Sequence, residues 1–463
     1  MLLTSFLVFL SIFLGIGLWS AKQSQGTTDD YLMAGQSVPP WLVGLSAIAT
    51  NNSGFMFVGM IGVTYQTGLS SIWLMIGWIA GDLCANLYTV SSVRRISKNT
   101  NIQSFGGLLA QWHDQHWPRA QALIGVVTVL FLTVYAAAQL KAGSKAATVM
   151  LGWHPDLGII ISAVLVLMYS MAGGLRASIW TDAAQSVVMF GGMLLLCWTG
   201  LQVIGGTGEA LSQLSAVSPQ YWQWFPDTSV TGKLLFVVGW FFGGFAVMGQ
   251  PQIVIRFMTL DDDRNVNRMR LWYYLWFVLF YALTVGVGLL SRLLIPETAN
   301  FDAETALPVM AAQILPAILV GLVLAAMFAA AMSTADSLIL ACSAAITRDF
   351  PHRKSLSLRS TKWVTFVVLS VAAGIGVSDQ KTVFALVLDA WGMLACTFLP
   401  LLLMQVKGRV FEEWQAIVVM LAGLASFLLW NQLGGGALVY SVAPGIVAGT
   451  VLAFALSKRK PVA

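Results

Sequence analysis

Ser333, Thr334, Asp336 and Ser337 lie within a stretch of small apolar residues, AAAMSTADSLILACS at 329 to 343. In an α-helix Ser333, Asp336 and Ser337 stand at i, i+3 and i+4, so hydroxyl and carboxylate oxygens share one stripe. Oxygen ligands of this kind suit a hard cation such as Na⁺. The alternative is structural: the hydroxyls bond to carbonyls of their own helix, and Asp336 pairs with a lysine.

The composition predicts that this stripe lies in a membrane. Of the 463 residues, 57% are hydrophobic and only 10% are charged, whereas soluble domains have roughly 25% charged residues. The net charge of +5 need not indicate nucleic acid, because membrane proteins distribute Lys and Arg asymmetrically. The cysteines have neither disulfide nor zinc-site spacing and are expected to be packing residues: Cys84, Cys197, Cys342 and Cys396.

Stretches of about 20 apolar residues predict about 13 membrane spans. They cover roughly 3–20, 40–66, 70–93, 118–150, 156–173, 179–205, 232–258, 269–293, 308–347, 361–378, 382–406, 413–431 and 436–456. The first is expected to be a retained span, because its first charge, Lys22, follows the apolar run rather than preceding it as in a signal peptide. The long segment near 206 to 231 is expected to be an external loop.

The basic residues separate sharply between the two sides of these spans. Of the 25 Lys and Arg residues, all but five fall on one side. Arg256 is counted on that side. The other side receives Lys141, Lys145, Lys233, Arg292 and Lys381. The positive-inside rule therefore predicts a cytoplasmic C-terminus and an external N-terminus.

Few residues of this chain are candidates for enzyme catalysis. The four histidines fall in predicted loops, and neither HExxH, GxSxG nor a complete phosphate-binding loop occurs. These histidines are His113, His116, His154 and His352. We therefore expect no catalytic residues and no cofactor. The polar residues inside the spans are typical of ion and solute pathways instead.

Two predicted spans have the composition of broken helices. The stretch SAIATNNSGFMFVG at 46 to 59 interrupts a span with small and polar residues, and GWFFGGFAVMGQPQIVIRFM at 239 to 258 contains Gly-Gln-Pro. These are the second and seventh spans, the spacing at which two inverted five-helix repeats place corresponding broken helices. The alternative is ordinary kinks and small-residue packing.

Four stretches together resemble one known family, the sodium:solute symporters, over most of the chain. They are DDYLMAGQSVPPWLVGLSAIATNNSGFMFVG at 29–59, GGLRASIWTDAAQSVVM at 173–189, GQPQIVIRFM at 249–258 and AAAMSTADSLILACSAAITRDF at 329–350. The GQP and RFM elements are most similar to the branch of bacterial proline symporters. The resemblance implies an all-α polytopic membrane protein with a five-plus-five inverted-repeat core of the LeuT type. The repeats would cover roughly 38–205 and 232–406 of a single domain, 1–463, with extra helices at 3–20, 413–431 and 436–456.

The resemblance also implies sites, carried over residue by residue. The principal sodium site would use carbonyls of Ala49, Asn52 and Ala330 and hydroxyls of Ser333 and Thr334. A second ion site, found in some members, would use Asp182, Ser333, Asp336 and Ser337. The solute would lie near Asn51, Ser53, Gly54, Trp240, Gln250 and Pro251. No metal other than sodium is expected.

Several positions depart from the proline symporter. That protein has Asp where this chain has Asn51, Arg where it has Gln36 and Tyr where it has Val247. Trp240 lies three residues further from Pro251 than the corresponding tryptophan, and Asp389 replaces a residue that is usually uncharged. These departures surround the expected solute pocket and leave the identity of the solute open.

The sequence therefore predicts sodium-coupled import of a small organic solute, with proline or another amino acid as the candidate, across a bacterial inner membrane. A proton-coupled carrier is an alternative that Asp336 and Asp389 favour. A non-transporting sensor or a membrane-embedded enzyme is a further alternative. The expected partners are the solute, Na⁺ and the lipid bilayer, without nucleic acid, and the oligomeric state stays open.

Overall fold

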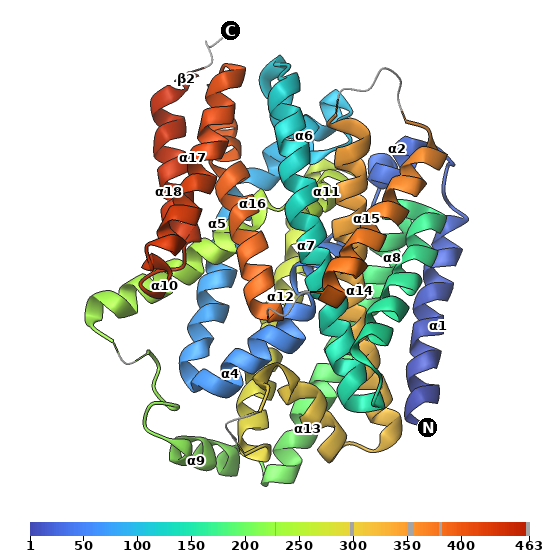
Figure 1. The fold of residues 1–463 in the computed structure, drawn as a ribbon, viewed down its shortest axis with the longest axis vertical. Helices are drawn as coiled ribbons and strands as arrows, with labels where there is room; N and C mark the ends of the chain where they lie inside the picture. The colour runs from blue at the N-terminus through green and yellow to red at the C-terminus, as the bar shows by residue number, and fades with distance from the viewer. Residues whose placement is uncertain (227, 297–300, 351–355, 379–381, 460–463) are drawn as a thin grey trace.

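A computed structural model describes residues 1–226, 228–296, 301–350, 356–378 and 382–459. Among these residues, ten helices are long and apolar enough to cross a membrane. The helices run mainly along the long axis of the molecule, and the first and last described segments of the chain lie at opposite ends of it (Figure 1). An odd number of crossings accounts for that placement. One histidine assigned to a loop and four of the basic residues counted above lie outside the described residues: His352, Arg353, Lys354, Lys381 and Lys460.

The helices have the following bounds. They are α1 Leu2–Ala21, α2 Thr28–Met33, α3 Pro40–Asn51, α4 Ile61–Thr67, α5 Ile72–Thr100, α6 Phe105–Ala110, α7 Pro118–Leu151, α8 Pro155–Ile204, α9 Thr207–Val217, α10 Val230–Phe245, α11 Pro251–Met258, α12 Val266–Leu294, α13 Ala306–Ile314, α14 Ala317–Arg348, α15 Leu358–Ser378, α16 Val383–Val406, α17 Glu413–Gln432 and α18 Val442–Leu456. Two short strands, β1 Arg409–Val410 and β2 Lys458–Arg459, pair antiparallel.

The long helix α8 contains two of the predicted spans. Its 50 residues would extend for about 75 Å as one straight helix, more than twice the roughly 30 Å of a bilayer core. At Gly174 the backbone leaves the helical region, with φ 55° and ψ −140°. A side chain there would place its Cβ 2.4 Å from the carbonyl oxygen of Tyr31, so glycine is required where α8 turns between its two passes.

The predicted ninth span, 308 to 347, is wrong at its start. Residues 306 to 314 form the separate helix α13, and α14 begins only at Ala317. Pro316 is the N-cap of α14, with an extended backbone. A proline cannot donate the backbone hydrogen bond that would continue α13 into α14, and it restricts the residue before it to extended conformations.

Both predicted broken helices are broken. The second span consists of α3, a non-helical segment beginning at Asn52, the π-helical turn Met56–Met60 (η2) and α4. The seventh consists of α10, the 3₁₀ turn Ala246–Gly249 (η5), an extended Gln250 and α11. Pro251 begins α11, where its missing N–H costs no helical hydrogen bond. Each break frees backbone groups near the middle of the molecule.

Helix α14 lies at the centre of the packing, against α7, α8, α1 and α15. Nearly all its residues from Val320 to Ala345 are buried.

Helices α5 and α10 also pack at unusually short range. A Cβ on Gly81 would lie 1.9 Å from the carbonyl oxygen of Phe241, and one on Gly244 would lie 1.8 Å from that of Trp78. Small residues let helix backbones approach in this way.

Arg256 corrects the predicted division of charges. We counted it with the basic residues of a cytoplasmic loop, but it lies within α11 and is buried. Its guanidinium is bonded to groups of α3, α8 and α14. A basic residue so close to the end of an apolar run is assigned to the loop by hydropathy alone, because hydropathy does not register a buried acidic partner.

Asp349 joins the end of α14 to the segment around α6. Its Oδ1 accepts hydrogen bonds from Ser104 Oγ at 2.5 Å and from Gln121 Nε2 at 3.0 Å. Burial raises the pKa of this carboxyl from 3.8 to about 7, although both hydrogen bonds favour the ionised form. Charging Asp349 therefore has a desolvation cost that these hydrogen bonds only partly offset.

We expect protonation of Asp349 to stabilise the protein. The contribution is complete below pH 3.8, the ordinary pKa, and is lost as the pH rises through about 7. The melting temperature of the purified protein should fall between about pH 5 and pH 8, and Asp349→Asn should flatten this dependence. Asp156→Asn, at a half-exposed position, is the control. Equal pH dependence in the wild type and in Asp349→Asn would contradict the assignment.

Candidate functional site

The last turn of α3 faces the polar stripe of α14. Ser333 Oγ lies 3.3 Å from the carbonyl oxygen of Ala49 and 3.1 Å from that of Ala330. Thr334 Oγ1 lies 3.2 Å from the carbonyl oxygen of Thr50. All these residues are buried. Since α3 ends here, the carbonyls of Ala49 and Thr50 lie in its last turn, where helix carbonyls lack the usual helical partner. The contact gathers neutral oxygens from two helices far apart in sequence.

Most of the predicted principal ion site is therefore together in space. Ala49, Ala330 and Ser333 are joined by the contacts above, and Asn52 follows α3 directly, with φ −86° and ψ 61°. Thr334 reaches the carbonyl of Thr50 rather than that of Ala49. The group consists of hydroxyl and carbonyl oxygens, which is the chemistry that Na⁺ needs.

The predicted second site contains Arg256. Asp182 Oδ2 accepts hydrogen bonds from Ser46 Oγ at 2.6 Å and Arg256 Nη2 at 3.1 Å. The guanidinium also donates to Ser337 Oγ, and Ser337 Oγ lies 3.1 Å from Asp336 Oδ1. Asp182 thus contacts the guanidinium directly and Asp336 is joined to it through Ser337, so the group carries one uncompensated negative charge when both carboxylates are ionised. Asp336 has this arginine nearby rather than the lysine of the structural alternative.

Part of that structural alternative is nevertheless present in α14. Ser337 Oγ donates to the carbonyl oxygen of Ser333 at 2.5 Å, and Ser333 bonds back to Ala330. These are bonds within the helix. These bonds within α14 do not account for the contacts of Ser333 and Thr334 with carbonyls of α3. The hydroxyls of the stripe therefore bond both to carbonyls of their own helix and to carbonyls at the end of α3.

The break after α3 is held by side chains from α7. The N–H of Gly54 donates to Gln139 Oε1 at 2.9 Å, and the N–H of Phe55 donates to Ser53 Oγ at 3.2 Å. Tyr135 OH lies 3.5 Å from Ser53 Oγ. A solute carboxylate at this helix start would therefore compete with Gln139 for a backbone donor.

Gly54 has a packing role that the sequence did not reveal. The family resemblance implied that Gly54 lies beside the solute. A Cβ on Gly54 would instead lie 2.8 Å from Ala142 Cβ and 3.0 Å from Gln139 Oε1. Glycine is present because α7 passes directly over the break.

Several buried amides around the breaks have an atom without a hydrogen-bond partner among the described residues. These atoms are Asn52 Nδ2, Gln139 Nε2 and Gln252 Oε1. Gln250, by contrast, donates from Nε2 to the carbonyl oxygen of Trp391 at 2.9 Å. A buried polar atom without a partner is costly, so these two donors and one acceptor are suited to a polar solute.

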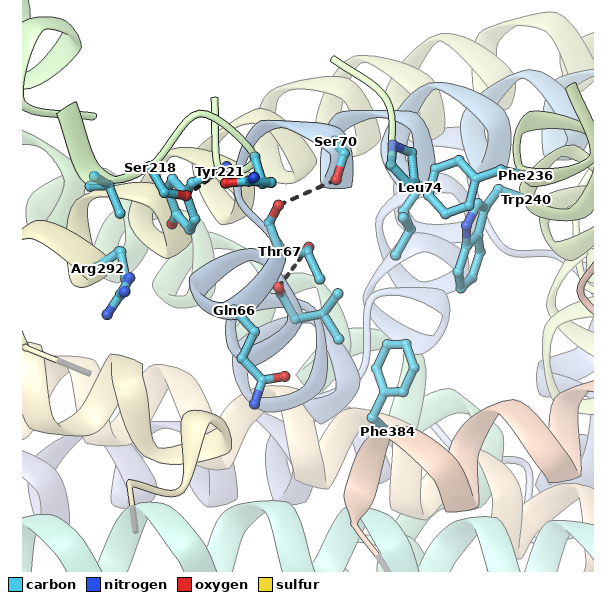
Figure 2. A pocket seen from close by; sticks show the side chains of 14 residues that line it. Gln66, Thr67, Ser70, Leu74, Ser218, Tyr221, Phe236, Trp240, Arg292 and Phe384 are labelled. Carbon is cyan, nitrogen blue, oxygen red and sulfur yellow. Dashed lines mark hydrogen bonds between the residues drawn. The ribbon is translucent and has the colours of Figure 1, made fainter. Parts of the chain in front are cut away.

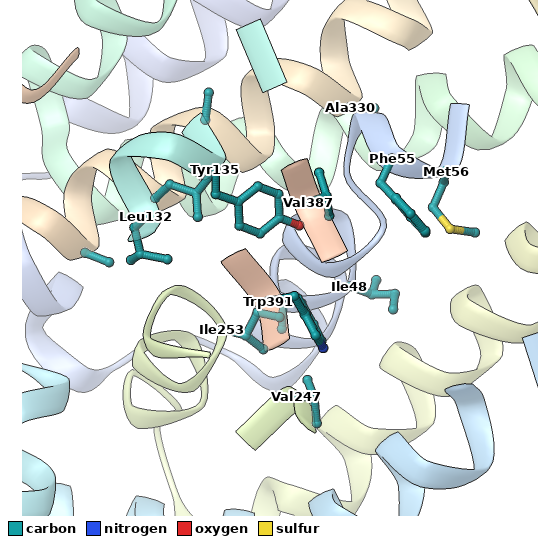
Figure 3. Close-up of a cluster of buried hydrophobic side chains, with 14 of the residues drawn as sticks. Ile48, Phe55, Met56, Leu132, Tyr135, Val247, Ile253, Ala330, Val387 and Trp391 are labelled. Carbon is teal, nitrogen blue, oxygen red and sulfur yellow. The ribbon is translucent and has the colours of Figure 1, made fainter. Parts of the chain in front are cut away.

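Apolar and aromatic side chains complete this region. Figure 3 shows Tyr135 and Trp391 among Ile48, Val247, Ile253, Ala330 and Val387, which come from both broken helices and from α7, α14 and α16. Val247 is fully buried. The wall at this position is therefore apolar.

Asn51 is turned toward α5 and α12. Its Nδ2 donates to Asp82 Oδ2 at 3.0 Å and to Tyr273 OH at 2.6 Å. Tyr273 and Tyr274 donate to Asp82 at 2.8 and 2.6 Å. Of the predicted solute residues, Asn51 is thus engaged with a buried acidic group behind the break.

Trp240 lies apart from the other predicted solute residues, on the wall of a cavity of about 490 Å³. Figure 2 shows this cavity between α4, α10, α12 and the start of α16, with Arg292 on one side and Trp240 and Phe236 on the other. Phe384 also lines it and stacks on Phe55 of the break, with ring centroids 5.2 Å apart. These stacked rings lie between the cavity and the break.

Sequence reasoning missed Arg256, Gln139 and Gln252 as site residues. A glutamine within the 34-residue apolar helix α7 was a signal that could have identified Gln139. Arg256 could have been found by asking which cation compensates Asp182 and Asp336. Asp82 lies within the predicted span 70–93, but its hydrogen-bond partners are distant in sequence.

Comparison with known proteins identifies a family and several relatives. The model of the sodium:solute symporter family matches residues 31–423. The high-affinity proline transporter PutP of Bacillus subtilis is 27% identical over 454 residues, covering 96% of this chain and 94% of that protein. Sodium/proline symporter 2 of Staphylococcus saprophyticus is also 27% identical, covering 98% of this chain and 92% of that protein.

Solved structures support the same fold. A Na⁺-coupled sialic acid symporter in a substrate-bound outward-open state superposes with a TM-score of 0.79 at 20% identity, covering 99% of both chains. Mhp1, a nucleobase-cation-symport-1 family transporter, superposes with a TM-score of 0.60 at 14% identity, covering 92% of this chain and 93% of its own. The predicted all-α transporter fold of the LeuT type is confirmed.

Proposed function

This chain belongs to the sodium:solute symporter family, and from that premise we propose that it imports a small amino acid by coupling it to Na⁺ bound between α3 and α14. It is a multi-pass membrane protein and a sodium-coupled transporter rather than an enzyme. The observation that carries the proposal is the contact of Ser333 and Thr334 with the carbonyls at the end of α3.

The principal sodium site is formed by the carbonyls of Ala49, Asn52 and Ala330 and the hydroxyls of Ser333 and Thr334. An ion there replaces weak contacts between neutral oxygens with direct coordination. Because α3 and α14 belong to different halves of the core, roughly 38–205 and 232–406, sodium ties the two repeats together. Ion binding then favours the arrangement of the break that accepts the solute.

A second monovalent cation is supported by the charges around Arg256. Asp182 and Asp336 carry one more negative charge than the guanidinium offsets, and each has a carboxylate oxygen without a partner among the described residues, Oδ1 of Asp182 and Oδ2 of Asp336. Either Na⁺ or H⁺ restores neutrality. Asp182, Ser333, Asp336 and Ser337 are therefore retained as a second ion site, and H⁺ there is the basis of the proton-coupled alternative.

The solute site lies around Ser53, Gln250 and Pro251, with Gln139 and Gln252 as additional polar groups. Unpaired donors on Asn52 and Gln139 suit a carboxylate, and the unpaired Oε1 of Gln252 suits an N–H group. The apolar wall at Val247 favours an apolar side chain. Relatives named as proline transporters make L-proline the first candidate.

We place the protein in a bacterial inner membrane with the N-terminus outside and the C-terminus in the cytoplasm. The support is the distribution of basic residues, together with the start of α1 and the strand β2 at opposite ends of the molecule (Figure 1). The cavity beside Trp240 then opens to the outside and is the entrance for the solute.

Ser333→Ala and Thr334→Ala should each raise the sodium concentration for half-maximal uptake by about tenfold, on the order of 1.4 kcal/mol for one lost ligand. Ser343→Ala is the matched control, because Ser343 lies on the same helix but bonds to Ile339 and Thr365. Uptake in proteoliposomes at fixed ionic strength measures the effect. Unchanged sodium dependence in both variants would remove this stripe from the ion site.

Counterflow in proteoliposomes identifies the solute and the coupling ion. We expect exchange of L-proline or another apolar amino acid, driven by an inward sodium gradient and not by a proton gradient alone. Sugars and monocarboxylates are tested in parallel. Uptake driven by a proton gradient without sodium would establish the proton-coupled alternative, and uptake of sugars alone would exclude an amino acid.

Single cysteines test the orientation. Ser215→Cys in α9 and Leu356→Cys before α15 should react with impermeant thiol reagents from opposite faces, outside and inside respectively. The parent protein without an added cysteine is the control for its native thiols. Labelling of both positions from the same face would contradict the predicted topology.

A further inference from the structure

Asp82 is a fully buried carboxylate whose observed hydrogen-bond donors are all neutral. Its Oδ2 accepts from Asn51 Nδ2 and Tyr273 OH, and its Oδ1 accepts from Tyr274 OH. The nearby Arg270 is bonded instead to Asn86. Each of these ion pairs among the described residues joins a basic side chain to an acidic group other than Asp82. A buried charge of this kind is expensive unless a cation lies near.

Asn51 connects this carboxylate to the ion site. It is the last residue of α3 and lies between Thr50, whose carbonyl meets Thr334, and Asn52. Its amide is held on one side of α3 by Asp82 and Tyr273. The carbonyls of Ala49 and Thr50 meet α14 on another side of α3. The two contacts therefore fix the rotation of this last turn.

We propose that Asp82 is a positioning residue for the coupling ion. Through Asn51 it holds the end of α3 with its carbonyls directed at α14, and its negative charge makes this neutral oxygen site more favourable for a cation. Binding of Na⁺ in turn lowers the cost of keeping Asp82 ionised. The inference rests on the proposed sodium site and extends it to a residue of α5 that does not touch the ion.

Sodium-dependent thermal stabilisation of the purified protein tests this inference without knowledge of the solute. The melting temperature is measured against NaCl, with choline chloride keeping the ionic strength constant. We expect Asp82→Asn to raise the sodium concentration at half-maximal stabilisation by about tenfold. Tyr274→Phe removes one hydrogen bond from the same carboxylate but keeps its charge, so its midpoint should stay within about twofold of the wild type.

Exchanging the residue types at positions 51 and 82 separates the effect of the negative charge from the effect of the hydrogen bond. The double variant Asn51→Asp and Asp82→Asn keeps a carboxylate and an amide facing each other across the same hydrogen bond, and it should restore the sodium midpoint to within about threefold of the wild type. It also provides a folded comparison if Asp82→Asn alone does not fold.

The outcomes are distinct. An unchanged midpoint in Asp82→Asn, equal shifts in Asp82→Asn and Tyr274→Phe, or an exchange variant that folds without rescue would each overturn the role of Asp82. Absence of sodium-dependent stabilisation in the wild type, or its full retention in Ser333→Ala, would overturn the sodium site itself.

Discussion

The arrangement of this protein depends on the contact between the end of α3 and the side of α14. Helix α3 stops in the middle of the molecule, and its last carbonyls face hydroxyls of α14 instead of another turn. In an apolar interior free backbone carbonyls are tolerated only when other groups satisfy them or when they face a cavity. The surrounding elements serve this condition: α7 supplies an acceptor for Gly54, and α5 and α12 fix Asn51.

Buried charged groups lie on two sides of α3. Asp82 lies on the α5 side of α3, whereas Asp182, Asp336 and Arg256 lie where α3, α8, α11 and α14 meet. Counting these groups as ionised, acidic charges exceed basic ones. A region with this imbalance attracts cations even where every direct ligand is neutral. The attraction for cations and the geometry of the end of α3 are therefore linked through Asn51, which bonds to Asp82.

The sequence predicted the broken helices, because Asn-Asn-Ser-Gly and Gly-Gln-Pro are locally incompatible with continuous helix. It also predicted the contact stripe, because helical spacing alone places Ser333 and Ser337 on one face. It did not predict that Arg256 turns inward or that Gly54 is crossed by α7. Those features depend on which distant helices pack together. Hydropathy likewise misplaced the start of α14, since α13 is nearly as apolar as the span it precedes.

The interface between α5 and α10 has a mechanical consequence. With Gly81 against the carbonyl of Phe241, and Gly244 against that of Trp78, little compressible side-chain material separates the two backbones. Such helices cannot slide or tilt past each other without steric collision. They are therefore expected to move together, so that any change in helix arrangement during transport occurs at other contacts of the molecule.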